Sequence, residues 1–164
     1  MKIGQEQVYN TLEKLQIEFD YMEHPALNTI EEAVKYKSGI DAGFCKNLFF
    51  RNHKGKKHYL VVFEHKYQLN IKDLEQRLKQ GKLSFASEKR MDKYLGLKAG
   101  SVSPFGLIND IENHVHVFLD ANLKKLDKWS FHPNHNEATL ILRQEDMMKY
   151  LDSIGNTYEF IELY

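Results

Sequence analysis

Cysteine and proline are scarce in this 164-residue chain, which contains one cysteine and three prolines. A single cysteine, Cys45, excludes an internal disulfide, and it also excludes the paired cysteines of a zinc finger or a dithiol redox motif. This composition is typical of a reducing compartment, so we expect a cytoplasmic protein. A chain of this length buries roughly 70% of its surface on folding, so one core suffices without disulfides or metals.

Long apolar stretches are also missing. The apolar run 60–63 is far shorter than the roughly 20 residues that cross a bilayer. The first seven residues, MKIGQEQ, lack the apolar segment of a signal peptide. We therefore expect an intracellular protein that has no membrane partner.

Neither sign of charge is in excess, because 23 basic residues balance 23 acidic ones. A domain that coats nucleic acid by bulk electrostatics has a basic balance, so we expect no DNA partner. A local patch remains compatible with contact to one RNA end. Lysines and histidines cluster at 53–58, where they form either a solvated turn or a surface for RNA phosphates.

Periodicity and capping signals predict a single domain, residues 1–164. Apolar spacing and a capping box at Thr29–Glu32 predict helices at 8–15, 29–39, 71–81, 87–96 and 146–151. Aromatic and β-branched segments predict strands at 19–21, 46–51, 58–63, 83–86, 114–120, 138–143 and 158–163, with a hairpin turn at 52–55. The stretch 96–106 is predicted to be a loop. The expected fold class is mixed α+β, with one curved, barrel-like mixed sheet surrounded by helices.

Lys46 begins a strongly apolar segment, where a lysine either faces solvent at a strand edge or points into a site. In a site, its ammonium group would bind a phosphate or a carbonyl oxygen. The neighbouring Cys45 would need a nearby base to act as a nucleophile. Because adjacent strand residues point to opposite faces, we expect Cys45 to face away from a site that contains Lys46 and to be an inert, packed thiol.

The segment Gly100–Pro104 combines a glycine, which allows close approach of the backbone to a ligand, with a stiffening proline. Its backbone N–H groups are suited to bind an oxyanion or an ester carbonyl. The same pattern is typical of an ordinary turn.

The histidines form two candidate groups, a pair in a predicted strand and one residue in a predicted loop. His114 and His116 are two apart in a predicted strand and would share a face, as metal ligands do, but no carboxylate or cysteine recurs at a standard ligand spacing. We therefore expect no metal. His132 precedes a proline in a predicted loop before a strand, and it is the stronger site candidate.

Several motifs occur in a fixed order along the chain: His24–Ala26, Thr29–Ala33, Lys46–Phe50, Leu83–Ser87, Leu95–Gly106 and His132–Asn136. Together they resemble the YbaK-like aminoacyl-tRNA editing domains, and within that family the free-standing prolyl-tRNA editing proteins of the ProX type. The resemblance covers nearly the whole chain. It implies hydrolysis of the ester that joins a mischarged amino acid, alanine, to the 3′-terminal adenosine of prolyl tRNA.

The resemblance also implies roles for individual residues. We assign catalysis to the positions that fall on the family's functional lysine, glycine loop and histidine, which are Lys46, Gly100 and His132. We assign substrate binding to positions beside them, which are Asn47, Ser101, Ser103 and Pro104. We expect no cofactor, no metal and no covalent intermediate. The expected partners are the acceptor end of prolyl tRNA and prolyl-tRNA synthetase.

Substrate choice has to come from a pocket that admits alanine and excludes proline. Ile30 and Val34 lie one turn apart in the predicted helix 29–39 and would narrow such a pocket, although core packing requires the same spacing. Two alternatives remain: a cysteine-specific deacylase of the same family, and a non-catalytic module that binds tRNA or a synthetase.

Overall fold

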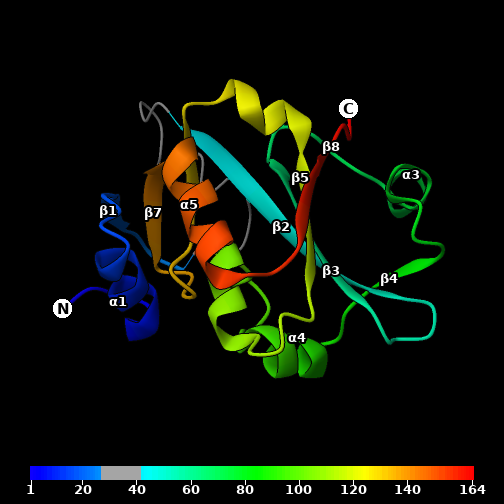
Figure 1. Ribbon diagram of the computed structural model, residues 1–164, viewed down its shortest axis with the longest axis horizontal. Helices are drawn as coiled ribbons and strands as arrows, with labels where there is room; N and C mark the ends of the chain where they lie inside the picture. Colours follow the sequence, from blue (N-terminus) through cyan, green and yellow to red (C-terminus); the bar gives the residue numbers. More distant parts are fainter. Residues whose placement is uncertain (27–41) are drawn as a thin grey trace.

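The computed structural model describes residues 1–26 and 42–164 (Figure 1). Its helices are α1 (Glu6–Lys14), α3 (Ile71–Leu78), α4 (Glu88–Leu95) and α5 (Gln144–Ile154), with 3-10 helices η1 (Pro104–Asn109) and η2 (Ala121–Lys125). Its strands are β1 (Asp20–Glu23), β2 (Gly43–Asn52), β3 (His58–Glu64), β4 (Leu83–Phe85), β5 (His116–Asp120), β6 (Lys128–Phe131), β7 (Ala138–Arg143) and β8 (Tyr158–Ile161). The predicted helix 29–39, with Ile30 and Val34, lies outside the described residues.

The eight strands form one mixed sheet in the order β1-β7-β6-β2-β3-β5-β8, and β4 pairs with β2 beside this path. Strand β2 runs antiparallel to β3 but parallel to β6, and β3, β5 and β8 are mutually parallel. The mixed sheet and its covering helices confirm the predicted fold class. The described sheet is open, with β1 and β8 at its two ends, and does not close into a barrel.

The sheet separates two apolar clusters because side chains alternate between its faces. The larger cluster contains Phe49 together with residues of α1, α4 and α5, such as Leu12, Leu95 and Leu151. The smaller cluster contains Phe50 and the buried leucines of α3. In Figure 1, α3 accordingly lies beside β4 at one end of the molecule, and α1 lies beside β1 at the other.

Strand β3 is apolar along most of its length because both of its faces are covered. Leu60 and Val62 belong to the larger cluster, whereas Tyr59, Val61 and Phe63 belong to the smaller one. The apolar run 60–63 therefore belongs to strand β3 of the sheet. No helix in the described part of the chain is long and apolar enough to cross a membrane.

Capping chemistry sets the ends of α4, which corresponds to the predicted helix 87–96. The Ser87 hydroxyl oxygen accepts a hydrogen bond from the Arg90 N–H at 3.2 Å, and Gly96 ends the helix in the left-handed conformation at φ 63°. The expected end of α3 is wrong, because Lys79 takes that conformation at φ 55° and Gly81 lies two residues beyond it.

One further expectation is wrong, and one strand was missed. The stretch 96–106 is not all loop, because the Ser103 hydroxyl accepts a hydrogen bond from the Phe105 N–H and η1 begins at Pro104. Strand β6 was not predicted. It has four residues, too few for a periodic signal, and it forms because it pairs with both β7 and β2.

A partly buried cluster of polar side chains joins the β2–β3 hairpin to α4. Arg90 Nη1 donates to the Gly55 carbonyl at 2.9 Å and to His58 Nε2 at 3.0 Å. His58 Nδ1–H therefore donates to His114 Nε2, at 2.9 Å, while the ring packs on Phe49 and Tyr94. Burial and the neighbouring His114 and Arg90 lower the pKa of His58 to about 4.

The lowered pKa of His58 makes the fold acid-sensitive. In the unfolded chain this group binds its proton near pH 6.5, so stability is complete above that value and falls as the pH drops toward 4. The free energy of unfolding should be about 2 kcal/mol lower at pH 5 than at pH 7.5. Urea unfolding at the two pH values measures it.

The His58→Gln variant supplies the control, because it keeps an acceptor for Arg90 and removes the titrating ring. It should be less stable at pH 7.5 but lose markedly less stability on acidification. Equal losses in the two proteins would assign the acid sensitivity to other groups.

Candidate functional site

Strand β2 changes partner along one of its edges. It pairs with β6 at Gly43 and Phe44 and with β4 from Phe50 to Asn52. The Ala86 N–H extends the second contact by one residue, since it donates to the Phe49 carbonyl at 2.9 Å. Neither strand pairs with residues 45–48, so among the described strands this stretch of the edge has no neighbour, and we call it the opening.

The hydrogen-bond pattern shows which backbone groups face this opening. The His65 N–H donates to the Phe44 carbonyl, and the Asn52 N–H donates to the Lys57 carbonyl, so even-numbered residues of β2 bond with β3. Backbone groups alternate in direction along an antiparallel strand. The N–H and carbonyl of Asn47 therefore point away from β3, toward the opening.

A cavity of about 260 Å³ lies at this opening, and we call it the site cavity. Four of the predicted site residues line it, Lys46, Asn47, Gly100 and His132. They come from β2, from the connection between α4 and η1, and from the connection between β6 and β7. The remaining wall is largely apolar and includes Phe49, Phe85, Met91 and Val102.

The other three predicted residues of the glycine loop lie elsewhere. Ser101 lines a neighbouring cavity of about 450 Å³ between residues 96–101 and 134–136. Ser103 is fully buried and caps η1, and the buried Pro104 accepts a hydrogen bond from the Tyr150 hydroxyl at 2.9 Å. Ser103 and Pro104 therefore hold the loop in place, and the expectation that they contact substrate is not supported by their position.

Lys46 brings the positive charge of the site cavity. Its side chain is half-buried, and within the described ranges 1–26 and 42–164 no carboxylate lies within ion-pair distance of it. Beside it, the buried side-chain oxygen of Asn47 has no hydrogen-bond partner among the residues that the structure describes. The cavity therefore presents a cation and a polar amide next to an apolar wall, as small-ligand sites do.

His132 has a defined ring orientation. Its Nδ1–H donates to the Ala138 carbonyl at 2.8 Å, which leaves the lone pair on Nε2 when the ring is neutral. His24 packs against it with ring centroids 6.0 Å apart, and His24 Nε2 accepts from the Thr139 hydroxyl at 2.8 Å. This supporting histidine was not among the predicted site residues, although it lies in one of the family motifs.

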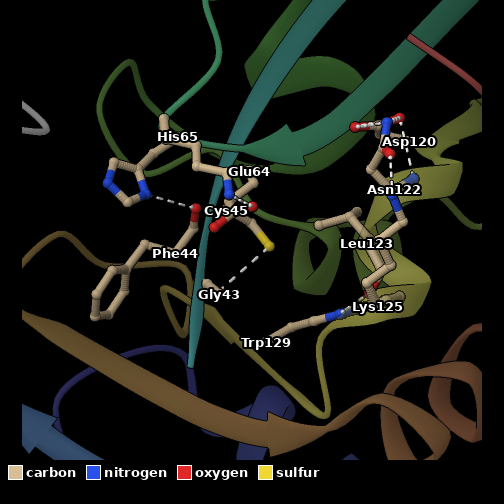
Figure 2. A network of polar contacts seen from close by, with 11 residues as sticks. Gly43, Phe44, Cys45, Glu64, His65, Asp120, Asn122, Leu123, Lys125 and Trp129 are labelled. Atoms are coloured by element: carbon tan, nitrogen blue, oxygen red, sulfur yellow. Dashed lines mark hydrogen bonds and ion pairs between the residues drawn. The ribbon is translucent and has the colours of Figure 1, made fainter. Parts of the chain in front are cut away.

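Cys45 also lines the site cavity, contrary to our expectation. Figure 2 shows Phe44 and Cys45 on opposite sides of β2, so the side chains do alternate. The cavity opens along the strand edge rather than over one face, and it therefore meets residues of both faces. The thiol packs against the larger apolar cluster, with Sγ 3.7 Å from the Gly43 carbonyl oxygen.

Gln5 ties together the two loops that carry Gly100 and His132. Its side-chain N–H donates to the Gly96 carbonyl at 3.2 Å, and its side-chain oxygen accepts from the Asn134 amide at 2.9 Å. Its backbone N–H donates to the Pro133 carbonyl at 3.1 Å. Nothing in the sequence identifies this role, since the contacts join residues about 90 and 130 positions apart.

His114 and His116 do not share a strand face. β5 begins at His116, and His114 precedes it and bonds with His58. His116 contacts Thr157 and Glu159 instead. Within the part of the chain that the structure describes, no group of three or more potential protein ligands is placed to hold a metal.

Comparisons with known proteins identify the family of this chain. Residues 24–150 match the family model of the aminoacyl-tRNA editing domain. The chain is 43% identical over 152 residues to the prolyl-tRNA editing protein ProX of Acetoanaerobium sticklandii, and the match covers 93% of each chain. It is 32% identical over 149 residues to the Bos taurus prolyl-tRNA synthetase associated domain-containing protein 1, covering 88% of this chain and 86% of the bovine one.

A solved structure shares the fold. It is described as a candidate trans-editing enzyme for prolyl-tRNA synthetase, and it superposes with a TM-score of 0.69 at 20% sequence identity. The superposition covers 95% of this chain and 94% of the other.

The Gln5→Ala variant should loosen both loops of the site cavity. It removes three side-chain hydrogen bonds, to Gly96, Asn109 and Asn134, and should lower the free energy of unfolding by about 1–2 kcal/mol. Urea unfolding measures the loss. The exposed Gln7→Ala, in the first turn of α1, is the matched control and should change stability by less than about 0.5 kcal/mol. Equal effects would remove Gln5 from this role.

Proposed function

Because this chain belongs to the aminoacyl-tRNA editing domain family, we propose that it hydrolyses the ester bond of alanine wrongly attached to prolyl tRNA. The observation that carries the proposal is the meeting of Lys46, Gly100 and His132, from three separate segments, in one cavity at the open edge of β2. The names of the relatives support prolyl tRNA as the substrate and prolyl-tRNA synthetase as a second partner.

An aminoacyl ester is already activated, so binding and polarisation are sufficient for catalysis. Lys46 binds the phosphate or ribose oxygen of the terminal nucleotide and places the ester at the cavity mouth. Backbone N–H groups around Gly100, together with that of Asn47, hold the carbonyl oxygen as it gains negative charge. The Ser101 N–H is excluded from this role because it donates to the Lys98 carbonyl.

Water attacks the carbonyl carbon, and the bond to the ribose oxygen breaks to release the free amino acid and the tRNA. The ribose hydroxyl beside the ester relays the proton from the attacking water to the leaving oxygen. This substrate-assisted route needs no protein nucleophile. His132, oriented by its bond to Ala138, contributes a polar wall beside the reacting ester.

A small, partly apolar cavity suits alanine. The synthetase cannot reject an amino acid smaller than proline strongly, since a missing methylene is worth only about 1–3 kcal/mol. A second site that is too small for proline removes the error by double sieving. Ile30 and Val34 remain predicted contributors to this selection.

The tip of the β2–β3 hairpin, residues 53–57, is a second site of contact with tRNA in this proposal. Lys54, Lys56 and Lys57 are exposed there. The Asn52 side-chain oxygen accepts the N–H groups of Lys56 and Lys57, and Arg90 of α4 holds Gly55. The lysines are thus presented on an ordered tip, as expected of a phosphate-binding surface.

The Lys46→Ala variant tests the deacylation. With alanyl-, cysteinyl- and prolyl-charged prolyl tRNA, the native protein should release alanine fastest and spare proline, whereas the variant should lose at least about a hundredfold in rate. Lys72→Ala, at an exposed lysine of α3, is the control and should keep full activity.

The panel of charged tRNAs also separates the alternatives. Faster release of cysteine would keep the family and change the substrate. Absence of hydrolysis above the spontaneous rate would overturn the hydrolase proposal and favour a binding module.

The hairpin tip is tested by the triple variant Lys54→Ala/Lys56→Ala/Lys57→Ala. It should weaken tRNA binding and lower the slope of log Kd against log salt by about two, because each phosphate contact contributes roughly 0.7–0.9. The rate at saturating tRNA should stay unchanged. A triple alanine variant of exposed lysines elsewhere, Lys14, Lys72 and Lys125, is the control, and equal slopes in the two variants would exclude a specific tip contact.

A further inference from the structure

Phe85 is an exposed aromatic residue at the mouth of the site cavity. Among the residues that the structure describes, three large apolar side chains are exposed, Met1, Phe85 and Ile111. Phe85 is 60% exposed and is the one of the three that lines the site cavity. Isolated exposed apolar side chains are ordinary on protein surfaces, so the position of Phe85 has to carry the argument.

One face of the Phe85 ring is supported, and much of the side chain is exposed. Phe85 pairs with Phe50 across β2 and β4, and the two rings stack with centroids 4.7 Å apart and planes at 30°. Phe50 is fully buried in the smaller cluster, so it provides a fixed base. An aromatic ring held flat on one side and exposed on the other is suited to stack another planar group.

Strand β4 holds this ring in place from both ends. The Leu83 N–H donates to the Glu75 carboxylate at 2.9 Å, and the Ala86 N–H donates to the Phe49 carbonyl at 2.9 Å. Leu83 and Ala86 are both buried. The ring therefore projects from an anchored three-residue strand, and little freedom is lost when a ligand stacks on it.

Cationic residues lie on both sides of the ring. Side chains of even-numbered β2 residues share one face, so Lys46 lies on the same face as Phe50 and the Phe85 stacked on it. In the other direction, β4 pairs with Arg51 and Asn52, where the lysine-rich hairpin tip begins. An aromatic ring between cations is the arrangement that binds single-stranded nucleic acid, with bases stacked and phosphates paired.

We propose that Phe85 is a stacking platform for the base of the nucleotide that carries the ester. This inference rests on the proposed function, because the esterified nucleotide has to lie at the mouth of the cavity that receives the amino acid. Stacking is tolerant of base identity, so Phe85 positions the substrate and does not read sequence. The ring touches substrate without taking part in bond breaking.

The test compares Phe85→Ala and Phe85→Trp on an alanyl-charged acceptor-stem minihelix whose 3′-terminal nucleotide carries adenine or no base. Phe85→Ala should raise KM about tenfold and leave kcat within about twofold, and Phe85→Trp should restore KM. Removing the base should raise KM about tenfold for the native protein. In Phe85→Ala, whose KM is already raised, removing the base should raise KM little further. Ile111→Ala is the matched control for an exposed apolar residue and should behave as the native protein.

Equal penalties for the missing base in the native protein and Phe85→Ala would overturn the proposal, as would an unchanged KM in Phe85→Ala. An effect of Phe85→Ala that appears only when prolyl-tRNA synthetase is added would also overturn it, and would assign the ring to a protein contact. Binding of the uncharged minihelix, with and without its terminal base, gives the same comparison without catalysis. That measurement keeps the stacking proposal testable if no ester is hydrolysed.

Discussion

The change of partner along one edge of β2 is the constraint on which the site depends. β6 runs parallel to β2 and leaves it after Phe44, whereas β4 arrives antiparallel at Phe50. Between them, no other described strand pairs with β2, whose two faces are packed in apolar clusters. The site cavity lies along this stretch of the edge and is lined by Lys46 and Asn47 of β2.

Hydrogen bonds from neighbouring segments hold the residues around this edge in place. Gln5 joins the loops that carry Gly100 and His132, and hydrogen bonds from His132 and His24 orient the two rings. Arg90 links the hairpin tip to α4. The contacts of Gln5, His24 and Arg90 join segments distant in sequence, so the side chains that line the site cavity are held in place by the fold itself.

Short-range sequence signals predicted most helices and strands. They failed where pairing between distant segments determines whether a strand forms. Ser87 and Gly96 mark α4 because caps act through neighbouring backbone groups. The four residues of β6 have no such signal, since the strand exists through β2 and β7. The alternation of side chains between the two faces of β2 was predicted correctly. Cys45 nevertheless lines the site cavity, because the cavity follows the strand edge.

The sequence alone determined the mixed α+β class, the β2–β3 hairpin, the caps of α4 and, through ordered motifs, the family and four residues of the site cavity. These features depend on short-range chemistry or on residue identity, which the chain carries in itself. The tertiary structure decided that Ser103 and Pro104 support the glycine loop, that Gln5 joins it to the loop that carries His132, that His24 packs on His132, and that Phe85 lines the site cavity while exposed. Those roles follow from contacts between residues far apart in the chain, which only packing and strand pairing bring together.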